Sequence, residues 1–194
     1  MSNKINEKTI TAAGDESPTV VKAGPVDSGL RVGMTLKNRF VLEIILGQGG
    51  MGTIFKARDL LKEEMGDRKP FVAIKVLHPK FQSNESLIKA LQREARKSQE
   101  LAHPNIVNVH DFDRDGKSVF MVMEFLQGKP LNGLIEEGGL EKLPLQERWS
   151  MIEKIGRGIA YAHENKVIHY DIKPGNVFIC DDGNVKILDF GIAK

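Results

Sequence analysis

The stretch His169-Tyr170-Asp171-Ile172-Lys173-Pro174-Gly175-Asn176 decides the fold of this chain, together with Asp189-Phe190-Gly191 further along. Asp171 can accept a proton from an attacking hydroxyl group, and Lys173 can offset the charge of a phosphoryl group in transfer. Asn176 and Asp189 carry the hard oxygen atoms that magnesium prefers as ligands. The two stretches therefore predict a site that handles a phosphate ester and its metal ion.

Length and composition limit what else the chain can be. It has 194 residues, 41% of them hydrophobic and 28% charged, which suffices for one or two small globular units with a core. No apolar run approaches the length of a membrane span, and the N-terminal stretch lacks the order of a secretory signal. A single cysteine, Cys180, leaves no intramolecular disulfide and fits a reducing compartment. We therefore expect a cytoplasmic protein with no membrane span.

Charge and histidine spacing argue against two further classes of site. The net charge of +2 is too small to indicate a nucleic-acid partner, and no block of lysine and arginine alternates with aromatic residues. The five histidines show no close metal-ligand spacing with one another or with Cys180, so we expect no zinc site.

Residues 1–33 are rich in small, polar and charged residues and show no sustained apolar periodicity. Such a segment cannot bury enough apolar surface to offset the entropy lost on ordering, so we predict a disordered N-terminal tail. Thr9, Thr11 and Thr19 lie in it. Two interpretations stay open: a solvated tail without a role, or a phosphorylated tail that recruits a partner.

The glycine-rich stretch Gly47-Gln48-Gly49-Gly50-Met51-Gly52 separates two strand-like runs, Phe40 to Leu46 and Thr53 to Ala57. Glycines let backbone amides approach phosphate oxygens without a Cβ atom in the way. Dinucleotide-binding folds share the G-x-G-x-x-G spacing, but there the loop opens a helix, whereas a second strand follows here. The pattern predicts a glycine-rich flap between two strands, with an ordinary glycine-rich hairpin as the alternative.

A charged connection, Asp59 to Pro70, is predicted to be a solvated loop and leads into the apolar run Phe71 to Leu77. Lys75 is the charged residue of this run, and a charge in an apolar strand needs a partner. The alternative is an edge strand from which Lys75 points outward.

We predict a helix from Ser83 or Asn84 to Leu101, because a capping residue precedes an acidic first turn. Its inward stripe recurs at three- and four-residue spacing and consists of Leu87, Leu91, Ala95 and Ser98. Glu94 borders that stripe and can point into the domain as a partner for Lys75. The alternative is an exposed pairing of Glu94 with a neighbour on the helix surface.

The second half of the chain turns from strands to a long helix. His103-Pro104-Asn105-Ile106-Val107 is predicted to end the preceding helix and start a strand, and another strand runs from Ser118 to Phe125. From Pro144 onward we predict a core helix, because apolar positions recur at helical spacing at Trp149, Ile152, Gly156, Ile159 and His163. A hairpin of residues 177–180 and 185–188 then returns the chain toward Asp171.

Six motifs stand in the order found in the protein kinase superfamily, and the sequence resembles that superfamily from about residue 34 to residue 194. They are the glycine-rich stretch, Val72-Ala73-Ile74-Lys75, the helical Glu94, His103 to Val107, the stretch around Asp171, and Asp189-Phe190-Gly191. Lys173 is typical of the serine/threonine class, and the stretch from Leu46 to Gly52 is similar to the bacterial Hanks-type, or eukaryotic-like, kinases.

The resemblance implies an α+β fold with the two lobes of a protein kinase. Residues 34–126 would form a complete small lobe, with a five-stranded antiparallel sheet, one helix and the hinge. Residues 127–194 would form the first part of a helical large lobe that ends just after Asp189-Phe190-Gly191.

The resemblance also implies ATP and magnesium as cofactors, and transfer of the γ-phosphate of ATP to serine or threonine hydroxyls of proteins, the chain itself included. Asp171 and Lys173 are then catalytic, and Asn176 and Asp189 hold magnesium. The expected nucleotide-binding residues are Leu46, Gly47, Gly49, Gly52, Ile54, Ala73, Lys75, Glu94, Met123, Glu124, Leu126 and Phe178. Met123 would be the gatekeeper, and backbone groups of Glu124 and Leu126 would bind adenine, although an edge strand leading to a linker would have the same sequence.

Two features depart from the family pattern. Tyr170 replaces the arginine that receives the activation-loop phosphate in the family, so we expect an active conformation that does not depend on that phosphate. The chain ends at Lys194, without an activation segment or an A-P-E motif. We therefore expect a fragment of a longer kinase or a truncated product, and the alternative function is an ATP-binding but catalytically inactive interaction module.

Overall fold

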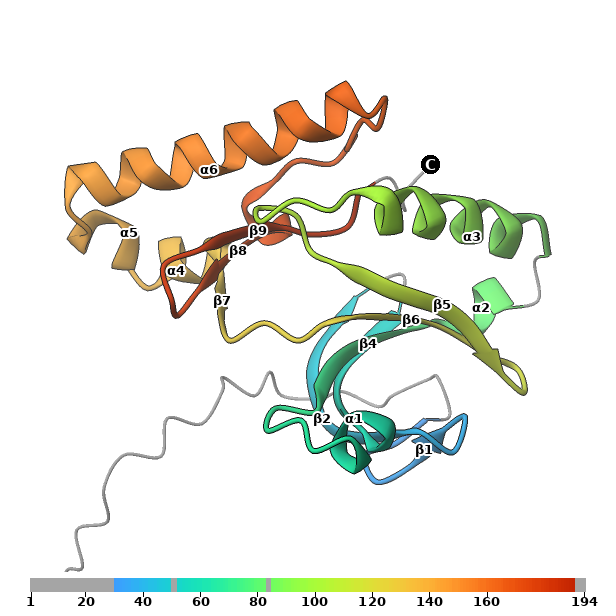
Figure 1. Ribbon diagram of the computed structural model, residues 1–194. Helices are drawn as coiled ribbons and strands as arrows, with labels where there is room; N and C mark the ends of the chain where they lie inside the picture. Colours follow the sequence, from blue (N-terminus) through green and yellow to red (C-terminus); the bar gives the residue numbers. More distant parts are fainter. Residues whose placement is uncertain (1–29, 50–51, 83–84, 191–194) are drawn as a thin grey trace, which may run out of the picture.

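The computed structural model describes residues 30–49, 52–82 and 85–190. Figure 1 shows a curled sheet flanked by helix α3, and a second, more helical part that includes α6. We call residues 30–123 the small lobe, residues 124–127 the hinge and residues 128–190 the large lobe. The tail threonines of the sequence analysis lie outside the described residues.

The small lobe contains six strands and three helices in its described part. The strands are β1 (Thr35–Leu36), β2 (Phe40–Gly49), β3 (Gly52–Asp59), β4 (Phe71–Leu77), β5 (Val109–Asp115) and β6 (Ser118–Glu124). The helices are α1 (Leu60–Glu64), α2 (Pro79–Gln82) and α3 (Glu85–Glu100). The strands form one antiparallel sheet in the order β1-β2-β3-β4-β6-β5. The sheet thus has six strands rather than the predicted five, because the two-residue strand β1 pairs with β2.

The large lobe begins with strand β7 (Gly128–Pro130), which pairs with the hairpin of β8 (Val177–Cys180) and β9 (Val185–Ile187). Its helices are α4 (Leu131–Glu136), α5 (Gly139–Lys142), α6 (Leu145–Glu164) and the 3-10 turn η1 (Pro174–Asn176). In Figure 1 the strands β8 and β9 lie between α6 and the small lobe. The predicted hairpin is therefore confirmed, and it carries the chain from the Asp171 stretch to Asp189.

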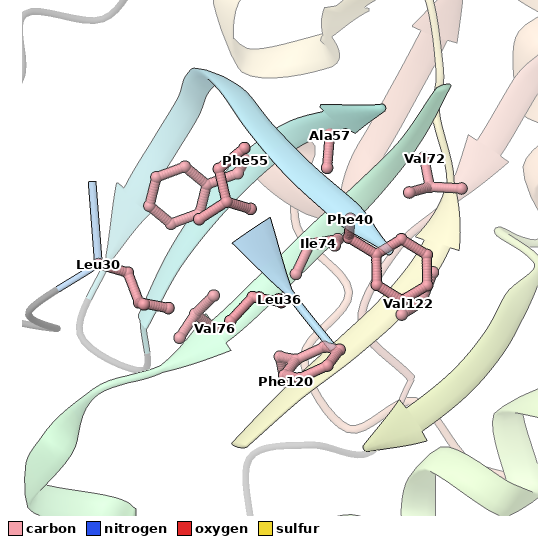
Figure 2. Close-up of a cluster of buried hydrophobic side chains, with 11 residues drawn as sticks. Leu30, Leu36, Phe40, Phe55, Ala57, Val72, Ile74, Val76, Phe120 and Val122 are labelled. Atoms are coloured by element: carbon pink, nitrogen blue, oxygen red, sulfur yellow. The ribbon is translucent and has the colours of Figure 1, made fainter. Parts of the chain in front are cut away.

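Both faces of the small-lobe sheet are covered by apolar side chains. Figure 2 shows one face closed by the curl of the sheet, with Phe55, Ile74 and Phe120 fully buried. On the other face, Leu91 and Ala95 of α3 pack in a second cluster with strand residues of β4, β5 and β6. The predicted inward stripe of α3 is confirmed at its described side chains, since Leu91, Ala95 and Ser98 are buried.

The packed region begins earlier in the chain than the predicted end of the tail. Leu30 is buried in the cluster of Figure 2, and the backbone N–H of Gly33 donates a hydrogen bond to the carbonyl of Leu42. Burial of Leu30 holds the chain against the sheet just before β1, so the packed small lobe begins at Leu30, although residues 31–33 are exposed.

The segment Asp59 to Pro70 is not the simple solvated loop that its charge suggested. Asp59 accepts a hydrogen bond from the N–H of Leu61 and so caps helix α1. The carboxylate of Asp59 is buried. It accepts hydrogen bonds from Nε and from one terminal nitrogen of Arg39, at 2.7 Å each. This bidentate pair ties the start of α1 to Arg39, the residue before β2.

The segment after α3 also differs from its prediction. His103 to Val107 ends the helix, but β5 starts only at Val109. Ile106 instead forms an isolated parallel bridge with Ile187 of β9, and the N–H of Val107 donates to the carbonyl of Ile187 at 3.0 Å. These residues are used to join the lobes, so they are not available to the small-lobe sheet.

Helix α6 forms where it was predicted, but only part of its predicted apolar stripe is packed: Ile159 contacts a buried cluster that includes Ile106 and Ile187. Trp149 and Ile152, expected in the core, are 61% and 57% exposed, whereas Gly158 and Ala162 are buried. A Cβ atom on Gly158 would lie 3.0 Å from the carbonyl oxygen of Asn105, so the small residue permits a close approach to the lobe junction. Apolar contacts and this close approach together decide which side of α6 packs.

Candidate active site

A cavity of about 560 Å³ lies between the glycine-rich hairpin of β2 and β3, the hinge and the large-lobe strands. The sequence-predicted residues that line it are Leu46, Gly47, Gly49, Gly52, Ile54, Ala73, Lys75, Met123, Glu124, Leu126, Asp171, Lys173, Asn176, Phe178 and Asp189. The side chain of Glu94 lies outside the described residues, so its pairing with Lys75 stays a prediction. Among described positions, the cavity therefore brings together all of the predicted site.

Some lining residues were not predicted as site residues, namely Gln48, Val107, Pro130, Gly175 and Leu188. Four of them lie within or beside motifs that the sequence analysis quoted, so proximity to a motif was a usable signal. Pro130 had no such signal, because its place depends on the pairing of β7 with β8.

Lys75 meets Asp189 inside the cavity. Lys75 stands on β4 between β3 and β6, opposite Ile54 and Met121, so the edge-strand alternative is wrong. Only 6% of Lys75 is exposed, and its Nζ lies 2.7 Å from Oδ1 of Asp189. A buried ammonium is costly without a partner, and the carboxylate of Asp189 supplies one.

The Asp171 stretch forms a hydrogen-bonded loop at the mouth of the cavity. Nζ of Lys173 lies 2.6 Å from Oδ2 of Asp171, and Nδ2 of Asn176 donates to the carbonyl and to Oδ2 of Asp171 at 2.8 and 3.1 Å. The hydrogen bond from Lys173 is the largest influence that lowers the pKa of Asp171 below its ordinary value. Asp171 is therefore ionised near neutral pH and can accept a proton.

His169 connects this loop to the residues before Asp189. Its ring is buried. Nδ1 accepts a hydrogen bond from the backbone N–H of Asp171 at 3.2 Å, and Nε2 lies 2.7 Å from the carbonyl oxygen of Leu188. Since Nδ1 accepts, Nε2 carries the proton and donates. The ring also packs 4.6 Å from the ring of Phe190, centroid to centroid. No role was predicted for His169 itself, and the structure shows that it links Asp171 to Leu188, the residue before Asp189.

Two residues of the site adopt left-handed backbone conformations without being glycine. Tyr170 has φ +62° and Asp189 has φ +55°, next to or within the predicted catalytic and metal positions. Such conformations cost free energy for residues with a Cβ atom, and they persist where surrounding contacts fix them. Here those contacts include the His169 bonds and the ion pair with Lys75.

The three described glycines of the flap have different local surroundings. A Cβ atom on Gly52 would lie 1.9 Å from the backbone oxygen of Val76, so only glycine fits there. A Cβ atom on Gly47 or Gly49 would meet nothing within 4 Å. Packing therefore explains Gly52, whereas open space beside Gly47 and Gly49 leaves room for a ligand that approaches the backbone.

Comparison with known proteins agrees with this geometry. The family described as the protein kinase domain matches residues 40–194. The chain belongs to the protein kinase family. Serine/threonine-protein kinase PknA of Mycobacterium tuberculosis is 40% identical over 169 residues, which cover 84% of this chain and 37% of PknA. Serine/threonine-protein kinase PrkC of Bacillus subtilis is 35% identical over 162 residues, which cover 84% of this chain and 24% of PrkC.

The relatives are bacterial Hanks-type serine/threonine kinases, and this chain spans well under half the length of PknA and PrkC. The crystal structure of the Mycobacterium tuberculosis PknI kinase domain superposes with a TM-score of 0.70, covering 86% of this chain and 63% of that chain. At 24% identity this likeness shows the kinase fold. None of the helices in the described part of the chain combines the length and apolar character that a membrane crossing needs.

Kinases use ATP with a divalent metal ion, and two residues of the cavity suit that ion. Asn176 donates through Nδ2, which leaves its Oδ1 as the hard donor atom, and Asp189 offers a carboxylate. Within the described residues no group of three or more His, Cys, Asp or Glu could hold a metal. Two protein ligands fit magnesium, which usually takes its other ligands from phosphates and water.

The hinge residue Glu124 has its side chain engaged. Oε1 of Glu124 lies 2.6 Å from Nζ of Lys186 and accepts the N–H of Asn108 at 2.7 Å. The N–H of Glu124 donates to the carbonyl of Asn108 at 3.0 Å. Lys186 belongs to β9, so this ion pair ties the hinge to the strand that precedes Asp189.

Proposed function

We propose that this chain carries the nucleotide site and catalytic loop of a serine/threonine protein kinase, which transfers the γ-phosphoryl group of ATP to hydroxyl groups of proteins. One observation carries the proposal: Lys75 and Asp189 are paired in the same cavity that Asp171 and Asn176 line, beneath the glycine-rich hairpin. This arrangement offers a cation for phosphate oxygens, hard ligands for magnesium and an ionised base within one site.

The residues divide the work of the site among them. Lys75 holds phosphate oxygens of ATP, the backbone at Gly47 and Gly49 covers them, and Asn176 with Asp189 binds magnesium. Magnesium, when bound, neutralises charge on the phosphates. The hinge backbone at Glu124 and Leu126 binds the adenine edge, under the gatekeeper Met123.

Asp171 orients the acceptor hydroxyl and takes its proton as the oxygen bonds to the γ-phosphorus. The bond from that phosphorus to the bridging oxygen breaks, and ADP leaves with the electron pair. Lys173, 2.6 Å from Asp171, stabilises the negative charge that moves with the phosphoryl group. Positioning and charge stabilisation supply most of the rate. Acceptors include serine and threonine residues of other proteins and of the chain itself.

A radiolabel transfer assay tests this proposal. The chain is incubated with magnesium, labelled ATP and a generic basic protein, beside Asp171→Asn, and ATP binding is measured on both proteins. We expect transfer by the wild type to fall by about 100-fold or more in the variant, while ATP binding stays. Binding without Asp171-dependent transfer would favour the inactive, ATP-binding interaction module instead.

A further inference from the structure

The hinge residue Phe125 belongs to a cluster on the small lobe outside the cavity. Its ring packs edge-on against that of Phe71, with centroids 6.3 Å apart and an interplanar angle of 66°. Nζ of Lys56 lies 3.9 Å from the centroid of Phe71 and 5.3 Å from that of Phe125. We call Lys56, Phe71 and Phe125 the hinge cluster. It joins β3 and the start of β4 to the hinge.

The hinge is held from two sides by neighbouring residues. Successive side chains of an extended segment point in opposite directions. Glu124 accordingly reaches Lys186 of the large lobe, while Phe125 reaches Phe71 of the small lobe. The hinge backbone is thus fixed to both lobes at consecutive residues.

The hinge cluster does not itself contact the space for a nucleotide. Its three members are half-buried, and none of them is among the described residues that line the cavity. The two residues on either side of Phe125, Glu124 and Leu126, do line it. The shortest route from Phe125 to a bound nucleotide therefore runs through the backbone between these two positions.

We infer that Lys56, Phe71 and Phe125 are positioning residues for the adenine-binding backbone of the hinge. This inference rests on the proposed function of the cavity as an ATP site. A cation over two aromatic rings and an edge-on ring pair each favour one arrangement of the group. Because the ring of Phe125 is attached to the hinge backbone, holding the ring restricts the carbonyl group of Glu124 and the backbone groups of Leu126 before a ligand binds. A hinge fixed in advance loses less conformational freedom on binding.

The test compares adenosine with ATP on the 194-residue chain. Dissociation constants for adenosine and for magnesium ATP are measured by titration calorimetry for the wild type, Phe125→Ala, Phe125→Tyr and Lys56→Met. We expect both ligands to bind about 5- to 10-fold more weakly to Phe125→Ala and about 2- to 3-fold more weakly to Lys56→Met, given the usual strength of these contacts. Phe125→Tyr keeps the ring and should bind within about twofold of the wild type.

Two further variants separate the hinge cluster from other effects. Lys117→Met is the matched control, because Lys117 is an exposed lysine at the turn between β5 and β6, and it should bind both ligands like the wild type. Lys75→Met should weaken ATP but not adenosine, because adenosine has no phosphates. The contrast shows that the hinge cluster acts on the base and Lys75 on the phosphates.

Three outcomes would overturn the inference. Unchanged adenosine affinity in folded Phe125→Ala and Lys56→Met removes the positioning role, while wild-type ATP binding leaves the proposed function in place. Equal weakening in Lys117→Met shows a general loss of stability. Absence of ATP binding by the wild type rejects the proposed function and the inference with it. Should Phe125→Ala fail to fold, Lys56→Met decides, since methionine is an unbranched apolar side chain of nearly the length of the lysine stem and has no charge.

Discussion

The small lobe and helix α6 differ in how they bury their apolar residues. The small-lobe sheet is covered on both faces, and Phe55, Ile74 and Phe120 are completely inaccessible. Helix α6 is packed on one side only, while Trp149 and Ile152 on another side are more than half exposed. The small lobe is therefore stabilised within itself, whereas α6 is stabilised through its contact with β9 and the lobe junction.

This difference shows that the size of an apolar side chain does not determine how much of it is buried. Trp149 is the single tryptophan of the chain and the largest apolar residue of α6, yet it contributes little buried surface. Gly158, which has no side chain, lies so close to Asn105 that a Cβ atom on it would be 3.0 Å from the carbonyl oxygen of Asn105. Apolar burial should dominate stability in the small lobe, whereas close backbone approach adds to apolar contacts at α6.

The largest expected effect comes from removing a buried ring of the small lobe. Phe120→Ala leaves a cavity in the cluster of Figure 2 and should lower the free energy of unfolding by about 3 to 5 kcal/mol. Trp149→Ala removes a larger ring from an exposed position and should change the free energy of unfolding by less than about 1 kcal/mol. Urea unfolding followed by circular dichroism measures both. Equal losses would contradict the difference between the two regions.

A smaller effect should come from the ion pair between Arg39 and the buried Asp59 of the small lobe. Burial raises the pKa of Asp59, but the hydrogen bond and charge of Arg39 outweigh it, so the pKa lies below its ordinary value. The carboxylate therefore stabilises the fold above the unfolded-state pKa of about 3.9, and this contribution is lost as the pH falls through the lower folded-state value. Asp59→Asn should cost about 2 kcal/mol at neutral pH and progressively less below about pH 4.

A matched control for Asp59 stands in the large lobe. Glu137 pairs with Lys129 at 2.6 Å, but both side chains are about half exposed. Exposed pairs contribute little, so Glu137→Gln should change stability by less than about 1 kcal/mol across the same pH range. Chemical unfolding at a series of pH values measures both variants. A pH-independent cost for Asp59→Asn would show that the charge of Asp59 is not what stabilises this part of the fold.

The sequence predicted well those parts whose local pattern and tertiary role coincide. Strand β4 runs from Phe71 to Leu77 as predicted, because a β-branched apolar run suits a central strand. The predicted site residues with described side chains meet in one cavity, because a short hairpin necessarily returns Asp189 toward Asp171. The convergence of these residues, which are far apart in the sequence, was predictable because they belong to motifs that form one site in the kinase family.

The parts that the sequence did not predict depend on contacts between distant residues. The charge of residues 59–70 indicated a loop, but the buried Asp59 pairs with Arg39, twenty residues earlier. The left-handed backbone of Asp189 is held by Lys75, 114 residues away. Helical spacing marks several apolar sides of α6, and the one that is buried is the side that meets Asn105 and Ile187.

The smallest effects come from two glycines of α6 that differ only in their surroundings. A Cβ atom on Gly158 would lie 2.8 Å from Cδ1 of Ile187 and 3.0 Å from the carbonyl oxygen of Asn105, whereas one on Gly156 would meet nothing within 4 Å. Gly158→Ala should therefore destabilise by about 1 to 2 kcal/mol, since the backbone of Asn105 must shift. Gly156→Ala should stabilise by about 0.5 to 1 kcal/mol, because alanine is the better helix former. Thermal unfolding of both variants measures the two signs, and stabilisation by both would mean that α6 does not pack closely on the lobe junction.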